Sequence, residues 1–247
     1  MPSRSAAASL QLSHKPLMLV VGGKTRLGDA LMSEIRRTGN PVLLLARSTA
    51  DASTFAQRFP GVAVLGDFQD LTNLPASPET CLAICALGPV HPTRPSFESD
   101  AAALERDLAT LARVICCCSG RIHVILVSTV LALAPGRDRC YYGGFKNLVE
   151  SVLARMIASR PDARLSVLYA GRLVPSSGLS ISSASTRYST LARKLLQVSA
   201  GERAQNCLVG IDARLWLALR CLRLGAIVLT GRLRAISLSQ RDGDARA

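Results

Sequence analysis

Apolar residues in this chain form short continuous runs separated by stretches with helical spacing. Each run holds four to six residues, mostly aliphatic, and has turn residues near its ends. Runs of this length without polar alternation are typical of strands covered on both faces of a parallel sheet. They predict strands at Leu17–Val21, Val42–Ala46, Val62–Leu65, Cys81–Ala86, Ile122–Val127 and Leu165–Tyr169.

Helical periodicity fills most of the intervals between these runs. Leu27, Leu31 and Ile35 are spaced to share one helix face, and Gly39 follows as a C-terminal stop. Further helices are predicted at Ala52–Arg58, Glu98–Cys117, from near Tyr142 to Ile157, and at Ala213–Leu222.

The alternation of strands and helices predicts the fold class. Parallel strands joined by right-handed helical crossovers give an α/β sheet with helices on both faces. We therefore expect a Rossmann-type doubly wound parallel sheet in one domain at residues 17–240, with tails at 1–16 and 241–247. The composition agrees, because 49% of the 247 residues are hydrophobic and only 4% are aromatic, so aliphatic side chains must form the core.

A formal net charge of +13 raises the possibility of a nucleic-acid partner. The basic residues are mostly Arg, spread singly, without the interleaved aromatic residues on which bases stack. A nucleic-acid-binding function therefore rests on net charge alone, and we expect no such partner. The apolar stretch from Leu215 to Thr230 contains Arg220 and Arg223 and is shorter than the ~20 apolar residues of a membrane span. We also expect no membrane partner.

The eight Cys residues form no CxxC pair and no Cys/His spacing typical of zinc sites. No metal site is expected. Because no secretory signal precedes them, the cysteines are predicted to be reduced thiols of a cytoplasmic protein.

A glycine-rich turn follows the first predicted strand and opens the first predicted helix. It reads Gly22-Gly23-Lys24-Thr25-Arg26-Leu27-Gly28. In a doubly wound sheet this turn receives a pyrophosphate, because glycines let the backbone approach and the helix N-terminus offers free N–H groups and partial positive charge. The sequence therefore predicts a dinucleotide site here.

The end of the second strand indicates which nicotinamide cofactor would bind. An acidic residue there would bind the ribose hydroxyls of NAD, whereas an Arg pairs with the extra phosphate of NADP. The strand ends in Ala46-Arg47-Ser48 with no carboxylate before Asp51, and Lys24 and Arg26 add positive charge. We therefore predict NADP(H), bound in part by Arg47 and Ser48. By their order along the chain, the further cofactor contacts are Asp67, Phe68, Ala86, Leu87 and Gly88.

Three residues with catalytic chemistry follow the fifth strand. Ser128 ends the strand, Tyr142 comes fourteen residues later, and Lys146 lies four residues beyond, on the same helix face as Tyr142. In order and spacing this set resembles the Ser and Tyr-x-x-x-Lys motif of the short-chain dehydrogenase/reductase family. The late segment Leu208–Asp212 and Ala170-Gly171-Arg172 resemble its extended and atypical branches.

The resemblance implies hydride transfer between NADP(H) and a carbonyl, alcohol or imine substrate. Tyr142 would be the general acid or base, and Lys146 would lower its pKa and contact the nicotinamide ribose. Ser128 would hold the substrate oxygen as an oxyanion-hole donor. Thr129, His91 and Tyr169 are further candidates for contact with the small-molecule substrate. The family also implies a homodimer or homotetramer.

The sequence departs from the family pattern in the glycine turn. The third glycine expected there would occupy Thr25 or Arg26, and neither is glycine. A non-catalytic NADP-binding sensor or regulator of the same fold therefore stays open, as does an epimerase or dehydratase that uses the nicotinamide transiently.

Overall fold

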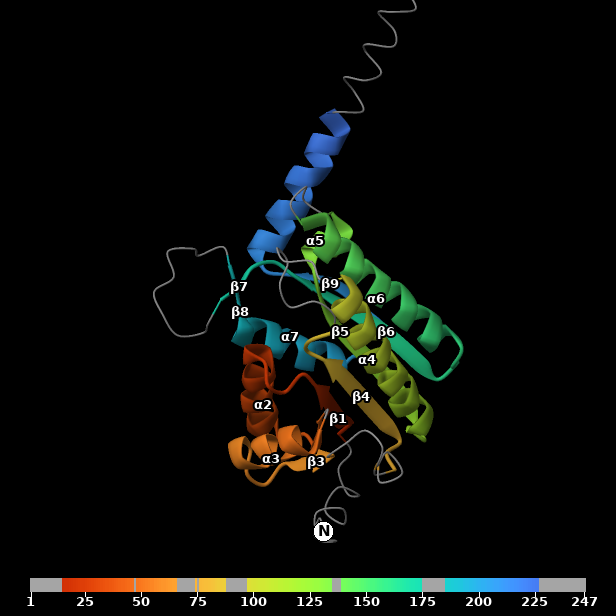
Figure 1. Cartoon of the computed structure of the whole chain (residues 1–247). Helices are drawn as coiled ribbons and strands as arrows, with labels where there is room; N and C mark the ends of the chain where they lie inside the picture. Colours follow the sequence, from red (N-terminus) through yellow and green to blue (C-terminus); the bar gives the residue numbers. More distant parts are fainter. Residues whose placement is uncertain are drawn as a thin grey trace, which may run out of the picture.

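The computed structural model describes residues 15–46, 48–65, 74, 76–87, 97–134, 139–174 and 185–226. Seven strands form one sheet in the order β3-β2-β1-β4-β5-β6-β9, and every neighbouring pair is parallel. This arrangement confirms the predicted doubly wound α/β fold (Figure 1). The strands are β1 (Leu17–Val21), β2 (Val42–Leu45), β3 (Ala63–Leu65), β4 (Glu79–Ile84), β5 (Arg121–Thr129), β6 (Ala163–Ala170) and β9 (Asn206–Val209).

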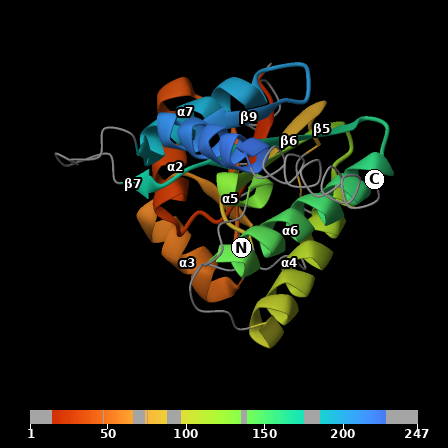
Figure 2. The same ribbon diagram turned by 90° about the horizontal axis from the view of Figure 1, so that it is seen from above.

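Helices cover both faces of the sheet. One layer holds α2 (Arg26–Thr38), α3 (Thr49–Arg58) and α7 (Tyr188–Ser199), and the other holds α4 (Phe97–Cys117) and α6 (Cys140–Ala158). Seen from above, α2 and α7 lie on one side of the strands and α4 and α6 on the other (Figure 2). The strands are therefore buried on both faces, which is why they appear in the sequence as unbroken apolar runs.

The first strand illustrates how the two cores are built. Met18 and Val20 point into the core beneath α2 and α7, whereas Leu19 and Val21 point into the core beneath α4 and α6. All four are at most 4% exposed. Because successive side chains in a strand point to opposite faces, a single aliphatic run supplies both cores.

Several elements were not predicted from the sequence. These are α7, β9, the short α5 (Val130–Leu133) and a separate two-stranded parallel pair of β7 (Leu173–Val174) and β8 (Thr186–Arg187). β9 pairs only with β6, and at the edge of the sheet its burial is partial. It therefore lacks the apolar signal of the central strands.

The last helix in the described ranges occupies residues 211–226 and extends the predicted one at both ends. It follows β9 and rises from the upper end of the sheet in Figure 1. Among the helices in the described ranges, none has the length and apolar character needed to cross a bilayer. None of the eight cysteines, all of which lie in the described ranges, forms a disulfide.

Candidate functional site

The glycine turn joins the end of β1 to the start of α2, at the carboxyl edge of the sheet. Thr25 is the N-cap of α2: its hydroxyl oxygen accepts a hydrogen bond from the Gly28 N–H at 3.0 Å and donates to the Gly22 carbonyl at 2.8 Å. The N–H groups of Arg26 and Leu27 have no hydrogen-bond partner among the described residues. Thr25 therefore organises the turn where a further glycine was expected, and leaves two helix N–H groups for an anion.

Two glycines of this turn allow close backbone approaches. Gly22 has a φ of +84°, and a Cβ there would lie 3.0 Å from the Ala86 nitrogen after β4. A Cβ on Gly28 would lie 2.7 Å from the carbonyl oxygens of both Gly22 and Gly23. The turn is thus packed against the neighbouring strand end, with α2 starting directly above it.

Of the three cations expected around the extra phosphate of NADP, Lys24 is already paired with a carboxylate and, within the described part of the chain, Arg26 is not. The Lys24 ammonium forms an ion pair with Asp51 in the first turn of α3. Arg26 is exposed and has no ion-pair partner among the described residues. Arg47 lies outside the described residues. Ser48 is the N-cap of α3, and its hydroxyl oxygen accepts from the Asp51 N–H at 3.2 Å.

Tyr142 and Lys146 lie one turn apart near the start of α6. The Lys146 nitrogen lies 5.5 Å from the centre of the Tyr142 ring and donates a hydrogen bond to the Leu87 carbonyl, just beyond β4. Lys146 is only 8% exposed, because α6 packs this side chain against the sheet. The predicted pair is therefore next to the strand end that also contacts the glycine turn.

Burial changes the titration of both groups. It lowers the pKa of Lys146 to about 8, and the nearby Glu150 carboxylate partly opposes the change. Burial raises the pKa of Tyr142, partly offset by the positive charge of Arg139. The expected lowering of the Tyr142 pKa by Lys146 is therefore wrong for the free protein, because burial outweighs the nearby positive charge. At neutral pH Tyr142 is a phenol and Lys146 is mainly a cation.

Ser128 faces a different partner from the one predicted. Its hydroxyl donates to the Glu150 carboxylate of α6, and the same carboxylate accepts from the Tyr169 hydroxyl of β6 at 2.9 Å. Ser128 is 6% exposed and Tyr169 is 8% exposed. The next residue, Thr129, is partly exposed at the end of β5, where its hydroxyl oxygen accepts from the Leu131 N–H at 3.3 Å. A hydroxyl has one proton to donate. Ser128 donates its proton to Glu150, whereas Thr129 only accepts in its hydrogen bond with Leu131 and keeps its proton for another partner.

Glu150 was missed in the sequence analysis. It lies four residues beyond Lys146 and eight beyond Tyr142, so helical spacing alone would have placed it on the same face of α6. Burial is the main cause that raises the pKa of Tyr169, and the hydrogen bond to Glu150 adds to it.

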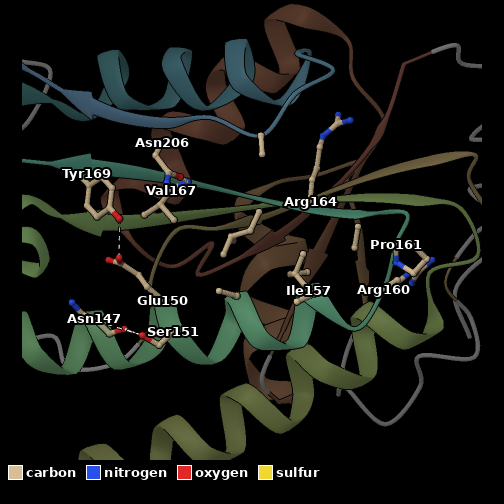
Figure 3. Close-up of a pocket in the computed structure, with 15 residues that line it drawn as sticks. Asn147, Glu150, Ser151, Ile157, Arg160, Pro161, Arg164, Val167, Tyr169 and Asn206 are labelled. Atoms are coloured by element: carbon tan, nitrogen blue, oxygen red, sulfur yellow. Dashed lines mark hydrogen bonds between the residues drawn. The ribbon is translucent and has the colours of Figure 1, made fainter.

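An open groove runs along α6 beside β6 and β9 (Figure 3). Glu150 and Tyr169 point toward each other at one end of it, and Arg160 and Pro161 lie at the other. Neither Tyr142 nor Lys146 lines the groove. The groove is therefore adjacent to the candidate site, and Glu150 belongs to both.

Several predicted site residues lie outside the described part of the chain. They are Arg47, Asp67, Phe68, Gly88 and His91. Within the described ranges no cluster of His, Cys, Asp and Glu could hold a metal ion.

Comparisons with known proteins give structural neighbours only. No family model matches the sequence, and no curated protein matches it either. A short-chain dehydrogenase from Burkholderia cenocepacia J2315, solved in complex with NADP, superposes with a TM-score of 0.64 at 15% identity, over 89% of this chain and 97% of the other. One from Streptomyces avermitilis gives 0.64 at 14% identity, over 89% and 96%. The chain has the short-chain dehydrogenase/reductase fold.

This short-chain dehydrogenase/reductase fold also occurs in neighbours with other named activities. A 3-ketoacyl-(acyl-carrier-protein) reductase from Brucella melitensis, complexed with NADH, has a TM-score of 0.62 at 13% identity, over 78% of this chain and 96% of that one. A UDP-N-acetylglucosamine 4-epimerase from Bacillus cereus has a TM-score of 0.55 at 16% identity, over 79% and 78%. At these identities the likeness establishes the fold, and the activity must be argued from the site.

Proposed function

We propose that this protein is a short-chain dehydrogenase/reductase that transfers a hydride between NADP(H) and a carbonyl, alcohol or imine substrate. The observation that carries the proposal is the position of Lys146, buried beside Tyr142 and hydrogen-bonded to Leu87 at the carboxyl edge of the sheet. In a doubly wound sheet this edge is where ligands bind. A proton donor and a cation are thus held together beside the glycine turn.

The glycine turn fits the pyrophosphate of such a cofactor. The free N–H groups of Arg26 and Leu27 and the side chain of Arg26 would bind it, and Lys146 would contact the nicotinamide ribose. When bound, the cofactor supplies or accepts the hydride. The preference for NADP(H) rests on Arg26 and Arg47, because Asp51 already neutralises Lys24.

Tyr142 is the proposed general acid of the reduction. Its raised pKa keeps the phenol protonated at neutral pH, so it can donate its proton to the oxygen that receives negative charge. The ammonium of Lys146 stabilises the phenolate that remains. Ser128 can hold the substrate oxygen only if its hydroxyl turns away from Glu150, and Thr129 offers a second hydroxyl at the same strand end.

A non-catalytic NADP-binding sensor is the second candidate. The bond from Ser128 to Glu150 favours it, because the predicted oxyanion donor is occupied within the protein. An epimerase or dehydratase is a third candidate, and the epimerase among the structural neighbours supports it.

Calorimetric titration of the purified protein with NADPH and NADH, followed by a carbonyl substrate screen, separates these candidates. We expect NADPH to bind more tightly than NADH, and Arg26→Ala and Arg47→Ala each to narrow that difference. Tyr142→Phe should retain cofactor binding and lose reduction. The matched control is Tyr141→Phe, which removes a hydroxyl from the neighbouring ring, whose centre lies 5.7 Å from the centre of the Phe145 ring. This control should retain both cofactor binding and reduction.

The outcomes point to different functions. Absence of binding by either cofactor would refute the proposal. Binding without turnover of any carbonyl or alcohol would favour the sensor. Turnover that survives Tyr142→Phe would refute the role of Tyr142.

A further inference from the structure

The helix at residues 211–226 exposes an apolar stripe. Ile211, Leu215, Leu219 and Leu222 are 61%, 53%, 64% and 71% exposed. Their spacing of four, four and three residues places them on one side of the helix. Four large exposed side chains on one helix face are more than the scattered apolar residues of an ordinary surface, and indicate an interaction site.

Other side chains in the first turns of this helix hold it against the body of the protein. The Asp212 carboxylate accepts from the Arg172 N–H at 2.5 Å and from the Thr186 hydroxyl at 2.9 Å. The Trp216 indole donates to the Ala134 carbonyl at 3.0 Å, and Ala213 is fully buried. These contacts fix the rotation of the helix, so the stripe points away from the sheet. In Figure 1 the helix rises beyond the upper end of α6.

Positive charges flank the stripe on both sides. At 100° per residue, Arg214 and Arg223 lie roughly 90° to either side of its centre. Both are exposed, and neither has an ion-pair partner among the described residues. Asp212, the one acidic residue of the helix, is hydrogen-bonded to the body of the protein.

This charge pattern distinguishes between the possible occupants of the stripe. Pairing with a second copy would bring together two sets of Arg without acidic partners, in molecules that each carry a net charge of +13. An anionic lipid surface offers both an apolar interior for the stripe and negative headgroups for the flanking guanidinium groups. We propose that residues 211–226 form an interfacial helix that docks the protein onto anionic bilayers. This proposal departs from the expectation of no membrane partner, which was drawn from the lack of an apolar run long enough to span a bilayer.

Vesicle binding of the full chain tests the proposal directly. Binding is measured by co-sedimentation with the vesicles, because Trp216, the single tryptophan of the chain, donates to the Ala134 carbonyl and faces the body of the protein. We expect binding to mixed phosphatidylcholine–phosphatidylglycerol vesicles, and much weaker binding to phosphatidylcholine alone. The stripe variant Leu219→Gln/Leu222→Gln should weaken binding at least ~10-fold. The flank variant Arg214→Gln/Arg223→Gln should weaken vesicle binding ~30-fold. Its two cations contribute similar free energies of attraction to the anionic surface, and the variant loses both.

A control variant removes the same charge from another surface. Arg113→Gln/Arg155→Gln changes two exposed guanidinium groups on α4 and α6 and should leave most of the binding intact. If this control variant loses as much vesicle binding as the flank variant, the attraction depends on the overall charge of the protein and not on this helix, and the proposal is overturned. Failure of the wild type to bind anionic vesicles would overturn it too. A lipid-free dimer that Leu219→Gln/Leu222→Gln converts to a monomer would assign the stripe to self-association instead.

Discussion

Substituting Gly28 with Ala tests whether the turn between β1 and α2 is packed as tightly as the structure indicates. A Cβ at this position would lie 2.7 Å from the Gly22 oxygen, the Gly23 oxygen and the Gly23 Cα. All three are backbone atoms, so no side-chain rotation relieves the overlap. The strand end and the first turn of α2 would have to separate.

The expected change in the free energy of unfolding is a balance of two opposing effects. Overpacking in a tight interior costs ~1–3 kcal/mol. Replacing a helical Gly with Ala favours the helix by about 1 kcal/mol. With three backbone overlaps the steric cost should lie at the upper end of that range, ~2–3 kcal/mol. The net loss is then roughly 1–2 kcal/mol, with a Tm lower by about 2–8 °C for a chain of this size.

Thermal unfolding followed by circular dichroism measures this difference, with Gly144→Ala as the matched control. Gly144 is also helical, in α6, but it is exposed and a Cβ there would meet no atom within 4 Å. We expect Gly144→Ala to be more stable than the wild type by about 0.5–1 kcal/mol, because only the backbone entropy term remains. If Gly28→Ala is stabilised as much as Gly144→Ala, the reasoning from the close approach is wrong.

Three further predictions concern Lys146, His123 and Arg160. Burial lowers the pKa of Lys146 from 10.5 to about 8, so between these pH values the unfolded state binds more protons than the folded state. The free energy of unfolding should therefore rise with pH across that window, by roughly 3 kcal/mol relative to Lys146→Met. Urea unfolding at pH 7.5 and 10 would contradict this if the wild type and the variant change equally. Burial and Arg164 lower the pKa of His123 from 6.5 to about 4, so the wild type should lose roughly 3 kcal/mol relative to His123→Gln as pH falls through that range. The Arg160 guanidinium donates to the Cys118 and Gly120 carbonyls after α4 at 2.8 and 2.7 Å, so Arg160→Met should cost about 1.5–3 kcal/mol in urea unfolding, against little change in the exposed Arg155→Met.

Local patterns in the sequence determined most of the sheet and part of the candidate site. The six aliphatic runs became β1 to β6 because a strand covered on both faces needs apolar side chains at nearly every position. Tyr142 and Lys146 share a face of α6 because their separation matches one helical turn. The glycine turn was recognisable because its conformation depends on residues adjacent in the sequence. Each of these features depends on neighbours within a few residues.

Only the tertiary structure decided which distant side chains meet. β2 lies beside β1, which brings the start of α3 to the glycine turn and pairs Asp51 with Lys24 across 27 residues. β6 pairs with β5 under α6, which brings Ser128 and Tyr169 to the same Glu150 carboxylate. The edge strand β9 and the direction of the stripe at residues 211–226 likewise depend on where the last segments dock. No periodic pattern encodes these contacts, because they depend on strand order and helix placement, and residue spacing does not specify either.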